Sequence, residues 1–156
     1  MSKDAFMRRA LALAREGMNG NAGGPFGAVI VKDGHILAEG CNRVTSTNDP
    51  TAHAEIVAIR EACRKLGTFD LAGAEIYASC EPCPMCLGAL YWARPRAVYF
   101  AATRIDAAAA GFDDALIYEE LARDPEARAL TFVHHPVSGA EAPFAAWLAN
   151  AARVRY

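Results

Sequence analysis

Two short motifs constrain this chain more than any other feature, because their residues work together only if the fold brings them together. The motifs are residues 53–55 (His-Ala-Glu) and 82–86 (Pro-Cys-Pro-Met-Cys). One histidine and a Cys-x-x-Cys pair provide three ligands for a tetrahedral zinc ion, and the fourth position is left for water or hydroxide. Such an open site is typical of catalytic zinc. We therefore predict one Zn²⁺ per chain, on His53, Cys83 and Cys86.

Glu55 supplies the acid–base group that such a site needs. It follows His53 by two residues, which places it close to a water molecule on the metal. One carboxylate can take a proton from water, pass it to a ring nitrogen and then protonate a departing amine. Zinc makes water nucleophilic near neutral pH. The motifs therefore predict hydrolytic deamination of an aminated purine or pyrimidine, with Glu55 as the catalytic residue.

A structural zinc or a redox dithiol is the alternative interpretation. A structural site needs a fourth protein ligand, and His134 and His135 are the only spare adjacent histidines. They lie on a candidate strand, where neighbouring side chains point to opposite faces, so at most one of them can reach the site. A redox dithiol would leave His53 and Glu55 without a role. These points favour the catalytic interpretation.

Strands and helices alternate along the chain, which predicts a three-layer α/β/α sandwich. Strands are expected at residues 27–32, 35–41, 74–79, 96–101 and, more weakly, 130–133, which gives a mixed five-stranded sheet. The apolar run at 96–101 is typical of a strand buried on both faces. Helices are expected at residues 3–17, 49–66, 84–93, 113–123 and 140–152, with a loop at 103–112.

Both motifs lie at predicted helix starts. Residues 49–50 (Asp-Pro) give an N-cap followed by proline at the first helical position, so the first motif should fall in the first two turns. Pro84 marks the second start, with Cys83 at the N-cap and Cys86 at the third helical position. This spacing makes the two cysteine side chains converge.

Composition indicates one folded domain spanning residues 1–156. Hydrophobic residues make up 53% of the chain and charged residues 22%, and no apolar run approaches the roughly 20 residues of a membrane span. The formal net charge is −2, without a basic stripe for nucleic acid. Cys41, Cys63 and Cys80 lie in apparent core segments, which suits the reducing cytoplasm. The N-terminus does not read as a secretory signal.

The two motifs together are the signature of zinc-dependent nucleobase deaminases. The chain resembles the cytidine deaminase-like superfamily and, within it, the small bacterial guanine deaminases over essentially its full length. The narrower resemblance is carried by residues 23–26 (Gly-Gly-Pro-Phe), 91–95 (Tyr-Trp-Ala-Arg-Pro), 110–114 (Ala-Gly-Phe-Asp-Asp) and Tyr156. It implies a cytidine deaminase-like fold and hydrolysis of guanine to xanthine and ammonia in purine catabolism or salvage.

The resemblance also implies roles for single residues, with zinc on the three predicted ligands and Glu55 as proton shuttle. Asn42 would hydrogen-bond the purine, Phe26 and Trp92 would flank its rings, and Asp114 and Tyr156 would help to read its edge. Because the amino-bearing C2 of guanine lies beside a protonated N1, an acidic residue such as Asp114 could accept a hydrogen bond from N1–H. The family forms homodimers that exchange their C-terminal segments, here residues 124–156, so Asp114 or Tyr156 would serve the partner's active site. The expected substrate contacts are Phe26, Asn42, Ala54, Trp92, Asp114 and Tyr156.

Each substrate contact also has an ordinary structural explanation. Phe26 and Trp92 are equally compatible with core packing, and Asn42 with capping of the loop after the hairpin. Asp114 suits a helix start, and Tyr156, at the chain end, would by default be disordered.

Three other functions remain open from the residues alone. A tRNA adenosine-to-inosine deaminase shares the zinc motif, but the acidic balance and the apolar last helix count against RNA binding. A cytosine or cytidine deaminase is a further alternative. A non-catalytic zinc-binding module belongs to another class and would bind metal without turnover.

Overall fold

The computed structural model describes residues 1–156, and its chain divides into two compact units, Met1–Asp114 and Ala115–Tyr156. None of its helices combines the length and apolar character needed to span a membrane. The strands are β1 (Gly27–Lys32), β2 (His35–Cys41), β3 (Glu75–Cys80) and β4 (Ala97–Ala102). The helices are α1 (Lys3–Asn19), α2 (Val44–Thr47), α3 (Ala54–Leu66), α4 (Pro84–Ala93), α5 (Arg104–Ala109), α6 (Ala115–Leu121) and α7 (Ala142–Ala149), with a 3₁₀ turn, η1 (Pro125–Ala127).

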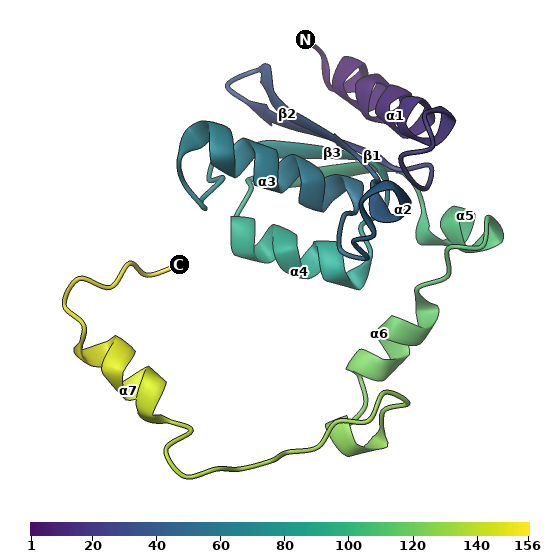
Figure 1. Ribbon diagram of the computed structural model, residues 1–156. Coiled ribbons are helices and arrows are strands. Elements are labelled where there is room, and N and C mark those ends of the chain that lie inside the picture. The colour runs from purple at the N-terminus through teal and green to yellow at the C-terminus, as the bar shows by residue number, and fades with distance from the viewer. The chain divides into compact units, whose positions relative to one another are not determined.

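The sheet is mixed and has the strand order β2-β1-β3-β4 (Figure 1). Strand β1 pairs antiparallel with β2 and β3, whereas β3 and β4 are parallel. The predicted mixed α/β sheet is confirmed, but it has four strands where five were expected. Residues 130–133 form no strand. They lie in the second unit, which contains no other strand with which they could pair.

Alternate side chains of β1 point into two different hydrophobic cores, one on each face of the sheet. Val29 and Val31 pack with α1 on one face, whereas Ala28 and Ile30 pack with residues of α3 and α4 on the other. This alternation is the two-residue period of a strand that is covered on both faces. Figure 1 shows the same layers, with α1 on one side of the sheet and α3 and α4 on the other. The predicted three-layer sandwich is therefore present within the first unit.

Two strand glycines let the helices approach the sheet closely. A Cβ atom on Gly27 would lie 2.2 Å from the carbonyl oxygen of Ala10 in α1. A Cβ atom on Gly40 would lie 2.3 Å from the carbonyl oxygen of Ala54 in α3. Real Cβ contacts are never this short, so any larger residue would push the helix away. Gly40 thereby fixes the depth at which the first turn of α3 lies on the sheet.

The prediction that residues 96–101 form a strand buried on both faces is wrong, because no residue of β4, the edge strand of the sheet, is buried. It pairs only with β3, and Phe100 is 47% exposed. The second unit is also open, because no residue between 115 and 156 is buried. The predicted helix at 113–123 is present as α6, but its apolar side chains are exposed. The predicted last helix is the shorter α7, whose Trp147 and Leu148 are also exposed.

Candidate metal centre and active site

The two candidate ligand motifs enter their helices in the same way. His53 is the N-cap of α3, with φ −67° and ψ 156°, and Cys83 is the N-cap of α4, with φ −66° and ψ 167°. Neither side chain makes a capping hydrogen bond to its own helix. Each is therefore available to bind a ligand at the helix end. The predicted start of α4 at Pro84 is confirmed.

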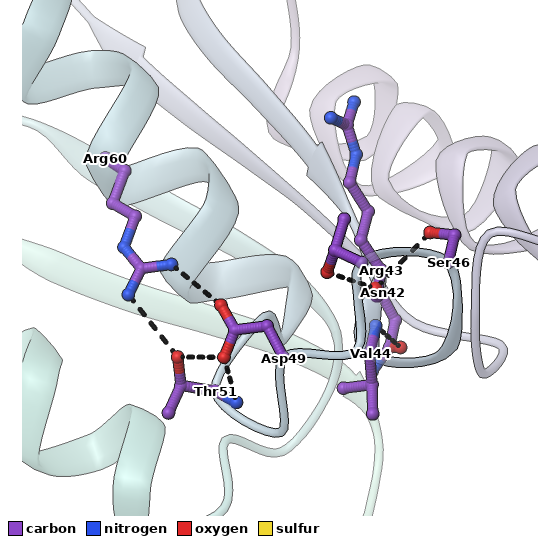
Figure 2. Close-up of polar contacts among 8 residues, drawn as sticks. Asn42, Arg43, Val44, Ser46, Asp49, Thr51 and Arg60 are labelled. Carbon is purple, nitrogen blue, oxygen red and sulfur yellow. Dashed lines mark hydrogen bonds and ion pairs between the residues drawn. The ribbon is translucent and has the colours of Figure 1, made fainter.

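The start of α3 differs from the prediction, because the helix begins at Ala54 rather than near residue 50. The carboxylate of Asp49 accepts hydrogen bonds from the backbone N–H of Thr51 at 2.8 Å and from its hydroxyl at 2.7 Å. This local turn takes the place of the predicted N-cap. Arg60 of α3 reaches back to both residues at 3.4 Å, as Figure 2 shows. The network holds the backbone that leads into His53.

The fold brings together the three predicted metal ligands. The Nδ1 atom of His53 lies 3.5 Å from the Sγ atom of Cys83 and 3.5 Å from that of Cys86. All three ligand atoms lie within 4.8 Å of one another. With zinc–sulfur bonds of about 2.3 Å and zinc–nitrogen bonds of about 2.0 Å, tetrahedral coordination separates sulfur and nitrogen ligands by about 3.5 Å. The donor set and its spacing therefore fit a zinc ion.

The contact between the two thiols shifts their pKa values in opposite directions. The hydrogen bond from Cys86, together with His53, lowers the pKa of the Cys83 thiol to about 4. The same contact with Cys83, together with burial, raises the pKa of Cys86. The hydrogen bond to Cys83 also raises the pKa of His53. A thiolate beside a ring nitrogen is a prepared site for a soft cation, because metal binding needs the deprotonated sulfur.

Glu55 is a buried carboxyl group directly beside this cluster. It is only 8% exposed, and its Oε2 atom lies 3.5 Å from the Sγ atom of Cys86. Burial raises the pKa of Glu55 because it disfavours the charged carboxylate. The upward shift moves the pKa of the carboxyl group towards the range in which general acid–base groups work. Glu55 therefore has the position expected of a proton shuttle.

Asn42 is buried, and its side-chain oxygen is held by the backbone. The oxygen accepts hydrogen bonds from the N–H groups of Gly24 at 3.2 Å and Val44 at 3.1 Å; the contact with Val44 is drawn in Figure 2. These two donors orient the amide, so its nitrogen is the group that can donate to a ligand. The predicted loop-capping role of Asn42 is thus present, and it leaves room for the predicted role as a donor to a base.

A cradle of glycine backbone explains why Asn42 can lie this close to the preceding loop. A Cβ atom on Gly23 would lie 2.2 Å from the Oδ1 atom of Asn42 and 2.7 Å from its carbonyl oxygen. Only glycine fits this approach. The packing role of Gly23 could not be predicted from its motif, because it depends on a contact with Asn42, 19 positions further along the chain.

Phe26 and Ala54 adjoin the ligand helices. Phe26 is half-buried and packs against the core cluster that contains Ala54 and Leu90. Its carbonyl oxygen accepts a hydrogen bond from the N–H of Asn42 at 3.0 Å. Ala54 is 1% exposed, so its methyl group serves the core of the sandwich. The core interpretation therefore holds for Ala54, whereas Phe26 keeps a face that is not in the core.

The three remaining predicted contacts, Trp92, Asp114 and Tyr156, are not members of the three-residue group that could hold a metal ion. Trp92 of α4 is 65% exposed, so it is not a core residue. Asp114 is partly buried, and this burial raises the pKa of its carboxyl group. Tyr156 is 70% exposed in the second unit, where its ring packs edge-on against Trp147 at 6.5 Å.

Comparison with known proteins gives the family. The family model of the cytidine and deoxycytidylate deaminase zinc-binding region matches residues 1–102 of the 156. The chain belongs to this family. It is thus a member of a family of zinc-binding deaminases, and the predicted membership is confirmed.

Individual members of the family differ in how much of this chain they match. The chain is 56% identical over 147 residues to the guanine deaminase of Bacillus subtilis (strain 168), which covers 94% of each chain. The X-ray structure of guanine deaminase from Bacillus subtilis matches with a TM-score of 0.98 and 54% identity, over 100% of this chain and 99% of that one. The tRNA-specific adenosine deaminase of Aquifex aeolicus (strain VF5) is 45% identical over 102 residues, which are 65% of this chain and 67% of that one.

Proposed function

We propose that this protein is a zinc-dependent hydrolase that converts guanine and water to xanthine and ammonia. The observation that carries the proposal is the convergence of His53, Cys83 and Cys86 around one point, with the buried Glu55 at 3.5 Å from Cys86. The choice of guanine is supported by the near full-length similarity to a guanine deaminase. The similarity to the tRNA-specific enzyme covers only 65% of the chain.

The proposed metal centre holds one zinc ion per chain on His53, Cys83 and Cys86. Zinc in such a site supplies Lewis acidity that makes water nucleophilic near neutral pH. Glu55 takes a proton from the attacking water and delivers it to N3 of guanine, because N3 is the unprotonated neighbour of the amino-bearing C2. Glu55 then takes the proton from the new hydroxyl group on C2 and passes it to the amino group, which leaves as ammonia while the C2 hydroxyl becomes the carbonyl of xanthine. Every proton transfer in the reaction passes through the one buried carboxyl group.

The remaining proposed roles concern binding of the base. Asn42 donates from its amide nitrogen to an acceptor atom of the purine, because its oxygen is already occupied by two backbone donors. Phe26 presents its ring to the flat base. Asp114 accepts from N1–H. Trp92 and Tyr156 are proposed as further pocket residues, and Ala54 as a contact through its backbone because its side chain is buried.

We further propose a homodimer in which each chain lends residues 124–156 to its partner, which completes a single deaminase domain per chain of residues 1–156. Two exposed apolar surfaces support this. On α7, Phe144 is 72% exposed and Leu148 is 67% exposed, and on α4, Tyr91 is 79% exposed. Apolar surface of this extent normally marks an interface. The exchange would bring Tyr156 to the partner's active site.

The proposed setting is the cytoplasm, where guanine enters purine catabolism or salvage. All five cysteines are free, which suits a reducing compartment, and two of them are proposed zinc ligands. No membrane or nucleic-acid partner is proposed.

A coupled assay of ammonia release tests the proposed function directly. Zinc-loaded protein is offered guanine, adenine, cytosine, their nucleosides and a tRNA anticodon stem-loop. The account expects ammonia from guanine in clear excess over every other substrate. Turnover of adenosine in the stem-loop with none of guanine would favour the tRNA enzyme, and zinc binding without any turnover would favour a binding module.

A further inference from the structure

Phe112 is an aromatic residue of the first unit whose ring edge meets the ring of Phe26. The two ring centroids lie 4.9 Å apart, and the ring planes are inclined at 87°. This is the edge-to-face arrangement that the charge distribution of aromatic rings favours. A Cβ atom on Gly24 would lie 3.2 Å from Phe26 and 3.3 Å from Phe112, so the glycine leaves just enough room for the pair. The rings of Phe26 and Phe112 thus both lie close to Gly24.

The backbone that carries Phe112 is fixed by the end of α5. Gly111 has φ +91°, and its N–H donates to Ala108 at 2.9 Å, while the N–H of Phe112 donates to Ala107 at 2.9 Å. This is the paired hydrogen-bond pattern of a Schellman C-cap, which needs a left-handed residue that glycine supplies at little cost. The position of the Phe112 ring therefore follows from the position of α5.

The start of α5 is tied to the segment that leads into the metal ligands. Thr103 and Asp106 form a capping box at the helix start. The backbone N–H of Arg104 donates to the carboxylate of Glu81 at 3.0 Å, and the thiol of Cys80 lies 3.5 Å from the carbonyl oxygen of Thr103. Glu81 precedes the proposed ligand Cys83 by two residues. Helix α5 therefore connects the ligand segment to the ring that contacts Phe26.

We propose that Phe112 is a positioning residue, which acts through Phe26 to hold its ring in the orientation that receives the substrate base. The proposal rests on the proposed function, in which Phe26 faces the flat purine. Phe26 is only half-buried, and the core supports one side of it. The ring edge of Phe112 supplies a second contact that restricts its rotation. Because the Phe26 ring is already oriented before the base binds, binding does not carry the entropy cost of ordering this side chain.

Kinetics on guanine separate this role from a purely structural one. The Phe112→Ala variant should raise KM about threefold to tenfold, as expected for loss of one edge-to-face pair, with kcat changed less than about twofold. The Phe112→Tyr variant keeps the ring edge and should restore the wild-type KM. The Ile105→Ala variant removes an exposed side chain from the same helix and should change neither constant. A wild-type KM in Phe112→Ala contradicts the proposal.

A double-mutant cycle shows whether Phe112 acts through Phe26. If it does, Phe112→Ala has no further effect on KM in a Phe26→Ala background, because the ring that it positions is gone. Additive effects overturn the proposal. A crystal structure of Phe112→Ala gives a reading that needs no turnover, with a changed or disordered Phe26 ring expected and an unchanged ring contradicting it. Absence of ammonia release from guanine by the wild type would contradict the proposed function alone, because the crystal structure would still decide the role of Phe112.

Discussion

The carboxyl group of Glu55 lies 3.5 Å from the sulfur of Cys86, in the same buried layer between sheet and helices. The closeness follows from the fold, since α3 and α4 both begin at the same end of the sheet, with a ligand at each N-cap. Burial raises the pKa of the carboxyl group, and the neighbouring sulfur belongs to the metal cluster. The proposed acid–base group and the proposed metal site are thereby neighbours.

Removal of one proposed ligand should release the metal. We expect Cys86→Ser to weaken zinc binding by more than about tenfold, because changes even to groups behind the ligands of metal sites cost about 10-fold to 100-fold. The Cys63→Ser variant is the matched control, since Cys63 is a free thiol of α3 outside the cluster. Competition against a chromophoric chelator measures both variants. Equal zinc affinity in the two would show that Cys86 is not a ligand.

Gly23 and Gly88 give a matched pair of glycine-to-alanine substitutions. At Gly23 the new Cβ atom would lie 2.2 Å from Asn42, so Gly23→Ala should destabilise the fold by about 1–3 kcal/mol and raise KM for guanine. At Gly88, within α4, the new Cβ atom meets nothing within 4 Å, so Gly88→Ala should stabilise by about 0.5–1 kcal/mol through helix propensity. Urea denaturation measures both free energies of unfolding. A Gly23→Ala protein with wild-type stability and KM would show that the loop does not position Asn42.

The ion pair of Arg9 and Glu39 should make stability depend on pH. Two hydrogen bonds, at 2.7 and 2.8 Å, join the guanidinium to the carboxylate, and this contact lowers the pKa of Glu39. The contribution is therefore complete above the unfolded-state pKa of about 4.3 and is lost as pH falls through the lower folded-state pKa.

Glu39→Gln tests that pair. It should be less stable than the wild type by about 0.5–1 kcal/mol near neutral pH, because the pair is partly exposed. The difference should shrink as the pH falls through the lowered pKa of Glu39. Denaturation midpoints across this range provide the measurement, and a difference that does not depend on pH would contradict the electrostatic origin.

The exchange of C-terminal segments predicts the oligomeric state. We expect the intact chain to be a dimer by sedimentation, and Phe144→Asp/Leu148→Asp to shift it towards monomer, since the charges would face the proposed interface. Leu11→Asp is the control, because Leu11 is an exposed apolar residue of α1 outside the proposed contact. A stable monomer of the intact chain contradicts the exchange.

Much of the first unit could be predicted from local patterns. The helix predicted at residues 3–17 is present as α1, and the strands predicted at residues 27–32 and 35–41 are present as β1 and β2. The convergence of His53, Cys83 and Cys86 could be predicted because Pro84 fixes the start of α4. A site whose residues are confined to two short motifs can be recognised from the sequence alone.

The predictions were wrong where a side chain makes a contact that the sequence pattern does not indicate. Asp49 bonds to Thr51 rather than capping a helix, so α3 starts later than predicted. Helix α5 was missed, although Thr103 and Asp106 form a capping box, because the helix is only six residues long. The burial of β4 was overestimated, because nothing local shows that a strand lies at the edge of its sheet. The contact of Phe26 with Phe112 also could not be predicted, because it joins segments that are far apart in the sequence.

The central claim is that one buried carboxyl group performs every proton transfer beside a three-ligand zinc site. Its most direct test is ammonia release from guanine by zinc-loaded Glu55→Ala, with zinc content measured in the same sample. The account predicts a full complement of zinc and a loss of kcat of at least about 10²–10⁴-fold, the usual effect of removing one such group. Substantial turnover by the zinc-loaded variant would contradict the account.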